Sequence, residues 1–343
     1  MSAIDEQWKN IHSARKNSTE MLDKLTKAVS HLTASDTSIV VSGSLARFEL
    51  TSGSDIDWSM LLDGSSDPRH YQVFQEIAAA VGGLSAKDVG REGAFGSLVS
   101  SHDLINYIGG EGDTNSNTTR RNLLLLESRS VGSDEAYNRV KKNLLQRYLA
   151  EDSGLWRKEV SNKLPHFLLN DLARYWRTMT VDYAYKERTR GGKGIPLRNL
   201  KLGMSRKLIY VAGLLACYEC HLAFNDEDRN AFYAEKNVPG LVALMHKTFQ
   251  QTPLEITAGI LMRFPVHESA SIRLFEAYDL FLGLLLDEDI RAHLEKLHSD
   301  RSENDPIYMR AKTIRRQFQQ AITDIFLTEN SELGRFTIRY GVF

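Results

Sequence analysis

The sequence predicts an α+β protein, with strands and helices mixed in the first part of the chain and only helices in the second. Three observations carry this prediction. Short apolar segments alternate with helical ones over the first 130 residues. From about residue 133 onward, apolar residues recur at the spacing of amphipathic helices. The chain has 343 residues, 42% of them hydrophobic, so we expect two domains, at 1–150 and 151–343.

Alternation, helical spacing and turn residues place the elements of the first domain. A glycine–serine pair ends the first apolar strand, and the polar turn 51–54 separates a short helix from the second strand. A proline near the start and two glycines at the end mark the longer helix that follows. The expected elements, in order, are a helix at 3–32, a strand at 37–44, a short helix at 45–50, a strand at 55–63, a helix at 67–83 and a strand at 95–101.

The second part carries long helical stripes of apolar residues, without an internal repeat or a low-complexity linker. Helical segments are expected at 134–152, 167–188, 204–224, 238–251, 268–300 and 305–327.

Composition limits the classes of function. The net charge is −1, so any electrostatic binding site must come from local clustering of charge. Residues 1–22 are polar, unlike a signal peptide. The longest apolar run, 208–217, is about half of the ~20 residues that a membrane span needs. We therefore expect a cytoplasmic protein without membrane insertion, in which 208–217 forms a buried helix.

The two cysteines, Cys217 and Cys220, form with His221 the C-x-x-C-H pattern of c-type haem attachment. Covalent haem belongs to exported proteins, and the sequence carries no export pattern. Residues three apart on a helix share a face, so we expect two buried, reduced cysteines, with haem or zinc as the alternatives.

Two acids in the second strand, Asp55 and Asp57, are expected to point to the same side of the sheet. Carboxylates this close need a cation between them, or one must take up a proton. Oxygen ligands suit Mg²⁺, which shares its coordination with substrate phosphates. The preceding Gly43 and Ser44 stand at a turn into a helix, where backbone amides bind phosphate. The alternative is a turn with an Asx cap and solvated acids.

The stretch 40–62, "VVSGSLARFELTSGSDIDWSMLL", resembles the DNA polymerase β-like nucleotidyltransferase superfamily. Its GS-x-x-R-x-E…SD-x-D form is similar to that of the uridylyltransferases of nitrogen signalling. The resemblance implies a small mixed sheet followed by a helical domain. It also implies transfer of a nucleoside monophosphate from a nucleoside triphosphate to a hydroxyl, with two Mg²⁺ ions (Mn²⁺ as an alternative) and release of pyrophosphate. Asp55 and Asp57 would bind metal, and Gly43, Ser44 and Arg47 would contact the nucleotide.

Members of this superfamily usually carry a third carboxylate on a later strand. Asp103 is our first choice because it precedes Gly109 by six residues, as in the uridylyltransferase-like pattern. Asp113 is the second choice, and a helix cap is the structural alternative for Asp103. The two metal ions would make a dedicated general base unnecessary.

The segment 185–207 holds eight lysines and arginines against one acid, Glu187. We expect some of these cations to reach the triphosphate or a polyphosphate strand; the alternative is a solvated face. The predicted nucleotide contacts are Lys193, Lys201, Arg206 and Lys207. The candidate aromatic residues for stacking on the base, each with a core role as its alternative, are Tyr175, Trp176, Tyr183 and Tyr185. For Arg120 and Arg121, which precede an apolar run, an ion pair with Asp113 or Glu127 is preferred to phosphate binding.

The acceptor of the nucleotide stays open between three hypotheses. The first is synthesis of a nucleotide oligomer, as in the antiphage-defence nucleotidyltransferases that this chain resembles, with the hydroxyl of Tyr340 as a candidate primer. A tail docked on the surface as a terminal strand is the alternative for this residue. The second is nucleotidylation of a protein or of a tRNA end by a toxin or regulator. The third is an inactive nucleotide-binding regulator. The sequence does not indicate the oligomeric state.

Overall fold

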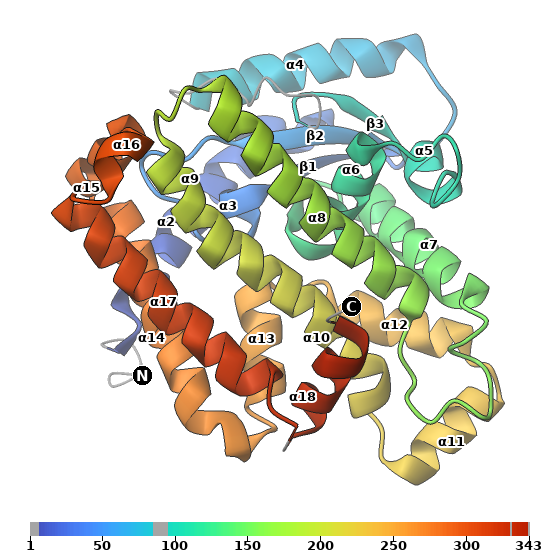
Figure 1. Cartoon of the computed structure of the whole chain (residues 1–343). Helices are drawn as coiled ribbons and strands as arrows, with labels where there is room; N and C mark the ends of the chain where they lie inside the picture. The colour runs from blue at the N-terminus through green and yellow to red at the C-terminus, as the bar shows by residue number, and fades with distance from the viewer. Residues whose placement is uncertain (1–6, 85–94, 330, 342–343) are drawn as a thin grey trace.

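A computed structural model describes residues 7–84, 95–329 and 331–341, and it has the α+β architecture expected from the sequence (Figure 1). The sheet has four strands in the order β3-β2-β1-β4. Strand β1 is antiparallel to β2 and β4, and β2 is parallel to β3, so the sheet is mixed. The strands are β1 (Thr37–Ser42), β2 (Asp57–Leu62), β3 (Leu98–Ser100) and β4 (Ser128–Val131).

The register brings three chain segments together at one end of the sheet. Ser42, the last residue of β1, pairs with Asp57, the first residue of β2. Ser42 also pairs with Ser128, the first residue of β4. Gly43, Asp57 and Glu127 are therefore neighbours, although Glu127 is 70 residues away from Asp57 in the chain.

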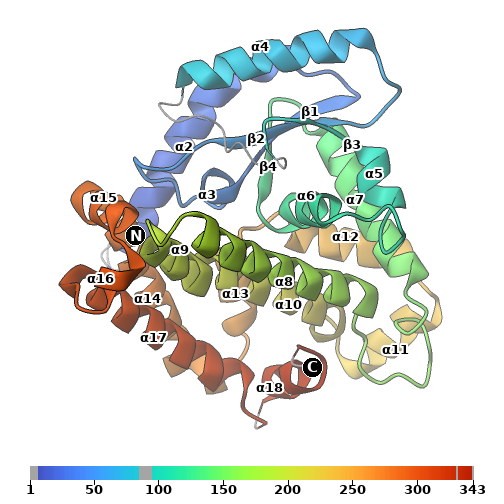
Figure 2. The same ribbon diagram turned by 45° about the horizontal axis from the view of Figure 1, so that its top comes forward.

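Both faces of the sheet are covered, as the alternating apolar residues require. On one face, Ile39, Trp58 and Met60 pack against helices α2 (Lys9–Val29) and α4 (Pro68–Leu84). On the other face, Val40 and Leu61 belong to the large apolar core that continues through the helical part of the protein. The helices on this second side are α5 (Ser101–Asn106), α6 (Asn115–Leu126) and α7 (Glu135–Glu151) (Figure 2).

The expected helical segments are present, together with short helices that the sequence analysis did not predict, among them α9, α11, α13 and α18. The segment 268–300 is broken after Leu286, where Asp287 caps the next helix through its side chain. Strand β4 was not anticipated because "ESRSV" lacks a clear alternation. The helices are α3 (Gly43–Ala46), α8 (His166–Thr189), α9 (Ile195–Lys201), α10 (Lys207–Leu222), α11 (Asp226–Ala234), α12 (Val238–Thr248), α13 (Pro253–Leu261), α14 (Glu268–Leu286), α15 (Glu288–Lys296), α16 (Ser299–Ser302), α17 (Pro306–Phe326) and α18 (Glu332–Phe336).

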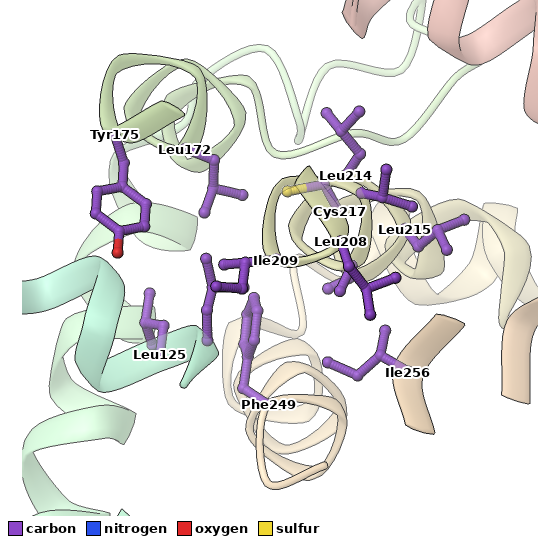
Figure 3. Close-up of a cluster of buried hydrophobic side chains, with 14 of the residues drawn as sticks. Leu125, Leu172, Tyr175, Leu208, Ile209, Leu214, Leu215, Cys217, Phe249 and Ile256 are labelled. Atoms are coloured by element: carbon purple, nitrogen blue, oxygen red, sulfur yellow. The ribbon is translucent and has the colours of Figure 1, made fainter. Parts of the chain in front are cut away.

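Helix α10 is the centre of the helical region, as the apolar run 208–217 predicts. Figure 3 shows its side chains packed together with Phe249, which comes from the end of α12. Cys217 and Cys220 are both buried thiols, and the Cys220 sulfur lies 3.3 Å from the Met245 sulfur. Burial raises the pKa of the Cys217 thiol, so the expectation of two buried, reduced cysteines agrees with their placement.

Within the described ranges, no single helix is long and apolar enough to cross a membrane. The segments Ile195–Leu222 and Asp226–Ala234 meet the length and composition criteria only as a pair, and the pair is bent by 90°.

Candidate functional site

The end of the sheet where β1 stops and β2 starts forms a close contact between a glycine and an acid. Gly43 has φ +70°, a left-handed conformation that favours glycine. A Cβ atom at Gly43 would lie 2.9 Å from the Asp57 Oδ2 atom. The Gly43 N–H donates a hydrogen bond to the Glu127 carbonyl oxygen at 3.2 Å. Glycine is therefore required here twice, for its backbone conformation and for the space beside the Asp57 carboxylate.

Asp55 and Asp57 have different surroundings. Asp55 is exposed in the turn before β2, whereas Asp57 is half-buried at the first position of the strand. Burial, and then the negative charges of Asp55 and Glu127, raise the pKa of Asp57 to about 7. Arg206 and Arg47 oppose this shift. The structure thus brings the two predicted acids together with a third carboxylate that the sequence reading did not select.

Behind this turn, a buried chain of charged and hydroxyl groups holds α3 in place. Arg47 donates to Glu49 at 2.8 Å and also to Glu127. The Tyr175 hydroxyl donates to Glu127 at 3.0 Å, and the Tyr278 hydroxyl donates to Glu49 at 2.6 Å. Two tyrosines from α8 and α14 therefore connect the helical region to the end of the sheet. The group contains two carboxylates and one guanidinium, so it adds a negative charge beside Asp57.

The expectation that Arg47 contacts the nucleotide directly is corrected by this arrangement. Its side chain is 11% exposed, and its guanidinium is occupied by Glu49 and Glu127. Arg47 instead supports the Gly43–Ser44 turn from within the protein, where its backbone N–H also donates to the Gly43 carbonyl oxygen.

Cations from the helical region face the two acids. Lys201 ends α9, and Arg206 ends the π-helical turn Leu202–Arg206 that joins α9 to α10. Burial, and then the charges of Arg291 and Arg206, lower the pKa of Lys201 to about 7, while Asp55 acts in the opposite direction. Arg206 is close enough to Asp57 to lower its pKa. The structure therefore places both predicted cations, Lys201 and Arg206, near the acids.

Arg291 of α15 is part of this wall and was not selected from the sequence. Its guanidinium donates to the Thr51 hydroxyl and the Gly53 carbonyl oxygen, and its Nε donates to Glu295 at 3.0 Å. A Cβ atom at Gly53 would overlap the guanidinium. The glycine in "TSGS" was the only local sign of this close approach, and it does not indicate which distant residue makes it.

The other two predicted cations lie elsewhere. Lys207 donates to Gln319 of α17 and does not turn toward the acids. Lys193 is exposed in the turn after α8, where its backbone pairs with His298. The segment 185–207 therefore divides into an inner pair, Lys201 and Arg206, and an outer group.

Asp103 does not lie near Asp57, which corrects the first choice for the third carboxylate. Because β3 is parallel to β2 with Met60 opposite Leu98, the level of Asp57 corresponds to Phe95, before β3 begins. Asp103 follows the other end of β3, in the first turn of α5, where it is exposed. About five residues of strand, or roughly 17 Å, separate the two ends. The cap of α5 is Ser100, so the structural alternative for Asp103 is not realised either.

Asp113, the second choice, is also occupied. Arg121 and Arg174 both pair with it at 2.5 Å, and the Gly109 N–H donates to it at 2.9 Å. Arg121 pairs in addition with Asp171 at 2.5 Å and is fully buried. The preference for an ion pair at Arg121 is therefore confirmed.

Tyr340 is docked far from the acids. Its hydroxyl accepts a hydrogen bond from Asn162 Nδ2 at 3.0 Å, and its ring contacts His166. His166 begins α8, nine residues or about 13 Å before Tyr175, whose hydroxyl binds Glu127. The C-terminal segment is helical, not a strand, because Phe336 inserts beside Tyr218 of α10. The tail in this position does not offer Tyr340 as a primer.

The four aromatic residues considered for stacking on the base differ in their burial. Trp176 stacks on Tyr210 with ring centroids 5.6 Å apart, and Tyr183 accepts a hydrogen bond from Asn199 at 3.1 Å. Tyr175 is buried. Tyr175 and Trp176 therefore take the core role, whereas Tyr183 is half-buried and Tyr185 is 55% exposed.

Comparison with protein-family models and with curated proteins found no match to this chain.

Proposed function

We propose that the protein is a Mg²⁺-dependent nucleotidyltransferase, which moves a nucleoside monophosphate from a nucleoside triphosphate to a hydroxyl and releases pyrophosphate. One observation carries the proposal: the Gly43 turn lies directly against the Asp57 carboxylate, beside Asp55, while Lys201 and Arg206 are close enough to interact electrostatically with these acids. Acids that bind metal and cations that bind phosphate are both needed where a metal triphosphate sits.

The residues fit a divalent cation that shares its ligands with the substrate. Asp55 and Asp57 offer the carboxylate oxygens that Mg²⁺ prefers. Among the residues that the structure describes, no three acid, histidine or cysteine side chains gather closely enough to hold a metal without other ligands. Phosphate oxygens and water would complete the coordination. A bound cation would supply neutralisation of charge on the triphosphate and a lower pKa for the attacking hydroxyl.

Each nearby side chain has a separate task in this proposal. Because the Gly43 N–H already donates to Glu127, the turn would contact phosphate through Ser44. Arg206 and Lys201 would bind the outer phosphates and offset their charge. Arg291 would hold the 51–53 turn and so fix the direction of Asp55.

The test is incubation of the purified protein with each radiolabelled NTP and dNTP in Mg²⁺, followed by measurement of pyrophosphate and of label on acceptors. We expect pyrophosphate from at least one nucleotide and a loss of roughly 10³-fold or more in Asp57→Asn. Asp103→Asn, a matched change of carboxylate to amide at the other end of the sheet, should keep activity within about twofold. Equal turnover in Asp57→Asn and the unaltered protein would overturn the proposal.

A second candidate is nucleotide binding without transfer. It is favoured because, in the described part of the chain, no third carboxylate is free to bind metal at the expected place. Glu127 binds Arg47 and Tyr175 instead. On the neighbouring segment before β3, the residue level with Asp57 is Phe95, which is not an acid. Nucleotide binding in Mg²⁺ by calorimetry, with no pyrophosphate from any nucleotide and acceptor mixture, would support this candidate instead.

A further inference from the structure

Positive charge is concentrated in one segment of this nearly neutral protein. Residues 177–207 contain nine lysines and arginines and two acids, although the whole chain carries a net charge of −1. One of the two acids, Asp182, pairs with Lys186 at 2.9 Å. The C-terminal end of this segment carries Lys201 and Arg206 of the candidate site.

An exposed stripe on α8 combines guanidinium groups with an aromatic ring. Arg177, Val181, Tyr185 and Arg188 are spaced by four, four and three residues, which puts them on one face of the helix. Val181 is 69% exposed and Tyr185 is 55% exposed, and both arginines are exposed as well. The Arg188 guanidinium lies over the Tyr185 ring, 5.8 Å from its centroid. We call these four residues the α8 stripe.

Helix α17 adds cations on the other side of α9. Figure 1 shows α9 between α8 and α17. Arg315 crosses the π-helical turn, where a Cβ atom at Gly203 would lie 2.5 Å from its Cδ, and it donates to Asn199 of α9. The neighbouring Arg316 is exposed. We call the exposed cations of α8, the π-helical turn and α17 the basic surface; all three elements contact α9, whose last residue, Lys201, belongs to the candidate site.

We propose that the acceptor of the transfer is the hydroxyl end of a single-stranded nucleic acid, whose backbone lies on this basic surface and one of whose bases stacks on Tyr185. The inference rests on the proposed function. The acceptor hydroxyl oxygen forms a bond to the α-phosphorus of the nucleoside triphosphate. The bond from that phosphorus to the oxygen of the β-phosphate breaks, pyrophosphate leaves with the electron pair, and the hydroxyl proton passes to solvent.

The combination of residues in the α8 stripe favours a nucleic acid over an acidic protein. Guanidinium groups bind phosphate oxygens at two points and stack on planar bases. An exposed tyrosine between arginines offers the flat apolar surface on which bases of any sequence stack. An acidic peptide would use the charges, but unlike a nucleic acid it does not present a planar group at every unit of its chain for Tyr185.

Binding is measured first without nucleotide or Mg²⁺, by fluorescence anisotropy with a labelled single-stranded RNA and DNA of about 20 nucleotides. Arg177→Glu/Arg188→Glu should weaken binding by about 10- to 100-fold. The slope of log affinity against log salt concentration should also become shallower, by the amount that about two phosphate contacts contribute. Lys24→Glu/Lys27→Glu, the matched reversal of two exposed charges on α2, should change affinity less than about threefold. Thermal melts of both variants verify folding, since all four positions are exposed.

Tyr185→Ala should weaken binding by about fivefold or more, whereas Tyr185→Phe should retain it. An equal loss in the α2 control, an unchanged affinity in Tyr185→Ala, or displacement of the RNA by polyglutamate at equal charge concentration would each overturn the inference. Transfer is then measured with the same oligonucleotide. Pyrophosphate release without binding to either strand would overturn this inference and leave the proposed function intact. Binding without pyrophosphate release from any nucleotide would overturn the proposed function, and nucleic-acid binding by the basic surface would then stand alone.

Discussion

Two groups of acids in this protein are built in opposite ways. Around Asp113, the carboxylates of Asp113 and Asp171 form ion pairs with the guanidiniums of Arg121 and Arg174. Asp113, Asp171 and Arg121 are buried. Around Asp57, the charges of Asp55 and Glu127 raise the pKa of the carboxyl above its usual value, and among the described residues no side chain donates a hydrogen bond to it. The first group has its full set of partners inside the chain. In the second, Asp57 has no direct hydrogen-bond or ion-pair partner among the described side chains, a place that a bound cation could take, and this is the difference between the two groups.

The largest expected effect breaks the matched group. In Asp113→Asn, the guanidiniums of Arg121 and Arg174 lose a buried countercharge, so the free energy of unfolding should fall by about 3 kcal/mol. Urea denaturation followed by circular dichroism measures this change. Asp57→Asn, the same chemical change in the unmatched group, is the control, and it should not lower stability. A similar loss in both variants would remove the distinction between the two groups.

The second effect concerns pH, because the pKa of Asp57 is raised from 3.8 to about 7 in the folded protein. Between pH 4 and 7 the folded state holds a proton on Asp57 that the unfolded chain has lost. The contribution of this group to stability is therefore present at low pH and lost as pH rises through this window. Without metal, Asp57→Asn should become more stable than the unaltered protein by on the order of 2 kcal/mol at pH 8, with little difference at pH 4.

Denaturation curves in EDTA at several pH values measure this gap. Addition of Mg²⁺ at pH 8 should stabilise the unaltered protein and leave Asp57→Asn unchanged. A stability gap that does not vary with pH would show that Asp57 is an ordinary exposed acid.

A third effect tests the contact that carries the proposed function. Gly43→Ala combines a left-handed backbone with a Cβ atom directed at Asp57, so we expect about a tenfold or larger loss of activity and about 1–2 kcal/mol of stability. Gly191→Ala is the matched control, because Gly191 also has a positive φ but open space around its Cα. It should cost about 1 kcal/mol and leave activity unchanged. Equal activity of the two variants would show that the Gly43–Asp57 contact is unimportant.

The smallest effect weakens the connection between the helical region and the sheet. Tyr278→Phe removes the hydroxyl that donates to Glu49, which should lower the free energy of unfolding by about 1 kcal/mol. Because Glu49 binds Arg47, the change should also lower kcat modestly while leaving KM similar. A loss of stability with unaltered kcat would show that this group supports the fold alone.

Short-range features of the site could be predicted from the sequence. Gly43, Ser44, Asp55 and Asp57 lie within fifteen residues, so the pattern of turn and strands was enough to predict that they form one site. The α+β fold class and the buried position of α10 followed from spacing for the same reason. Lys201 and Arg206 stood out because their segment is unusually basic.

Features that depend on how distant segments meet could not be predicted. Glu127 reaches the site through β4, a strand with no clear alternation, and Arg291 reaches it through the packing of α15. Asp103 was misplaced because its spacing to a glycine does not indicate at which end of the parallel pair β2–β3 it lies. Arg47 looked like a ligand contact because the sequence does not show that its guanidinium binds both Glu49, two residues away, and the distant Glu127.

The π-helical turn between α9 and α10 has a consequence for the evolution of this wall. In a regular α-helix, residues five apart, such as Lys201 and Arg206, differ in direction by about 140°. A π-helical turn, with its hydrogen bonds between residues five apart, brings these two positions nearly above each other. Loss of one codon, such as that for Gly203, would put the two cations four residues apart in a regular α-helix, where they would still share a face. The π-helical turn therefore lets this part of the chain carry one additional residue between Lys201 and Arg206 without separating the two side chains.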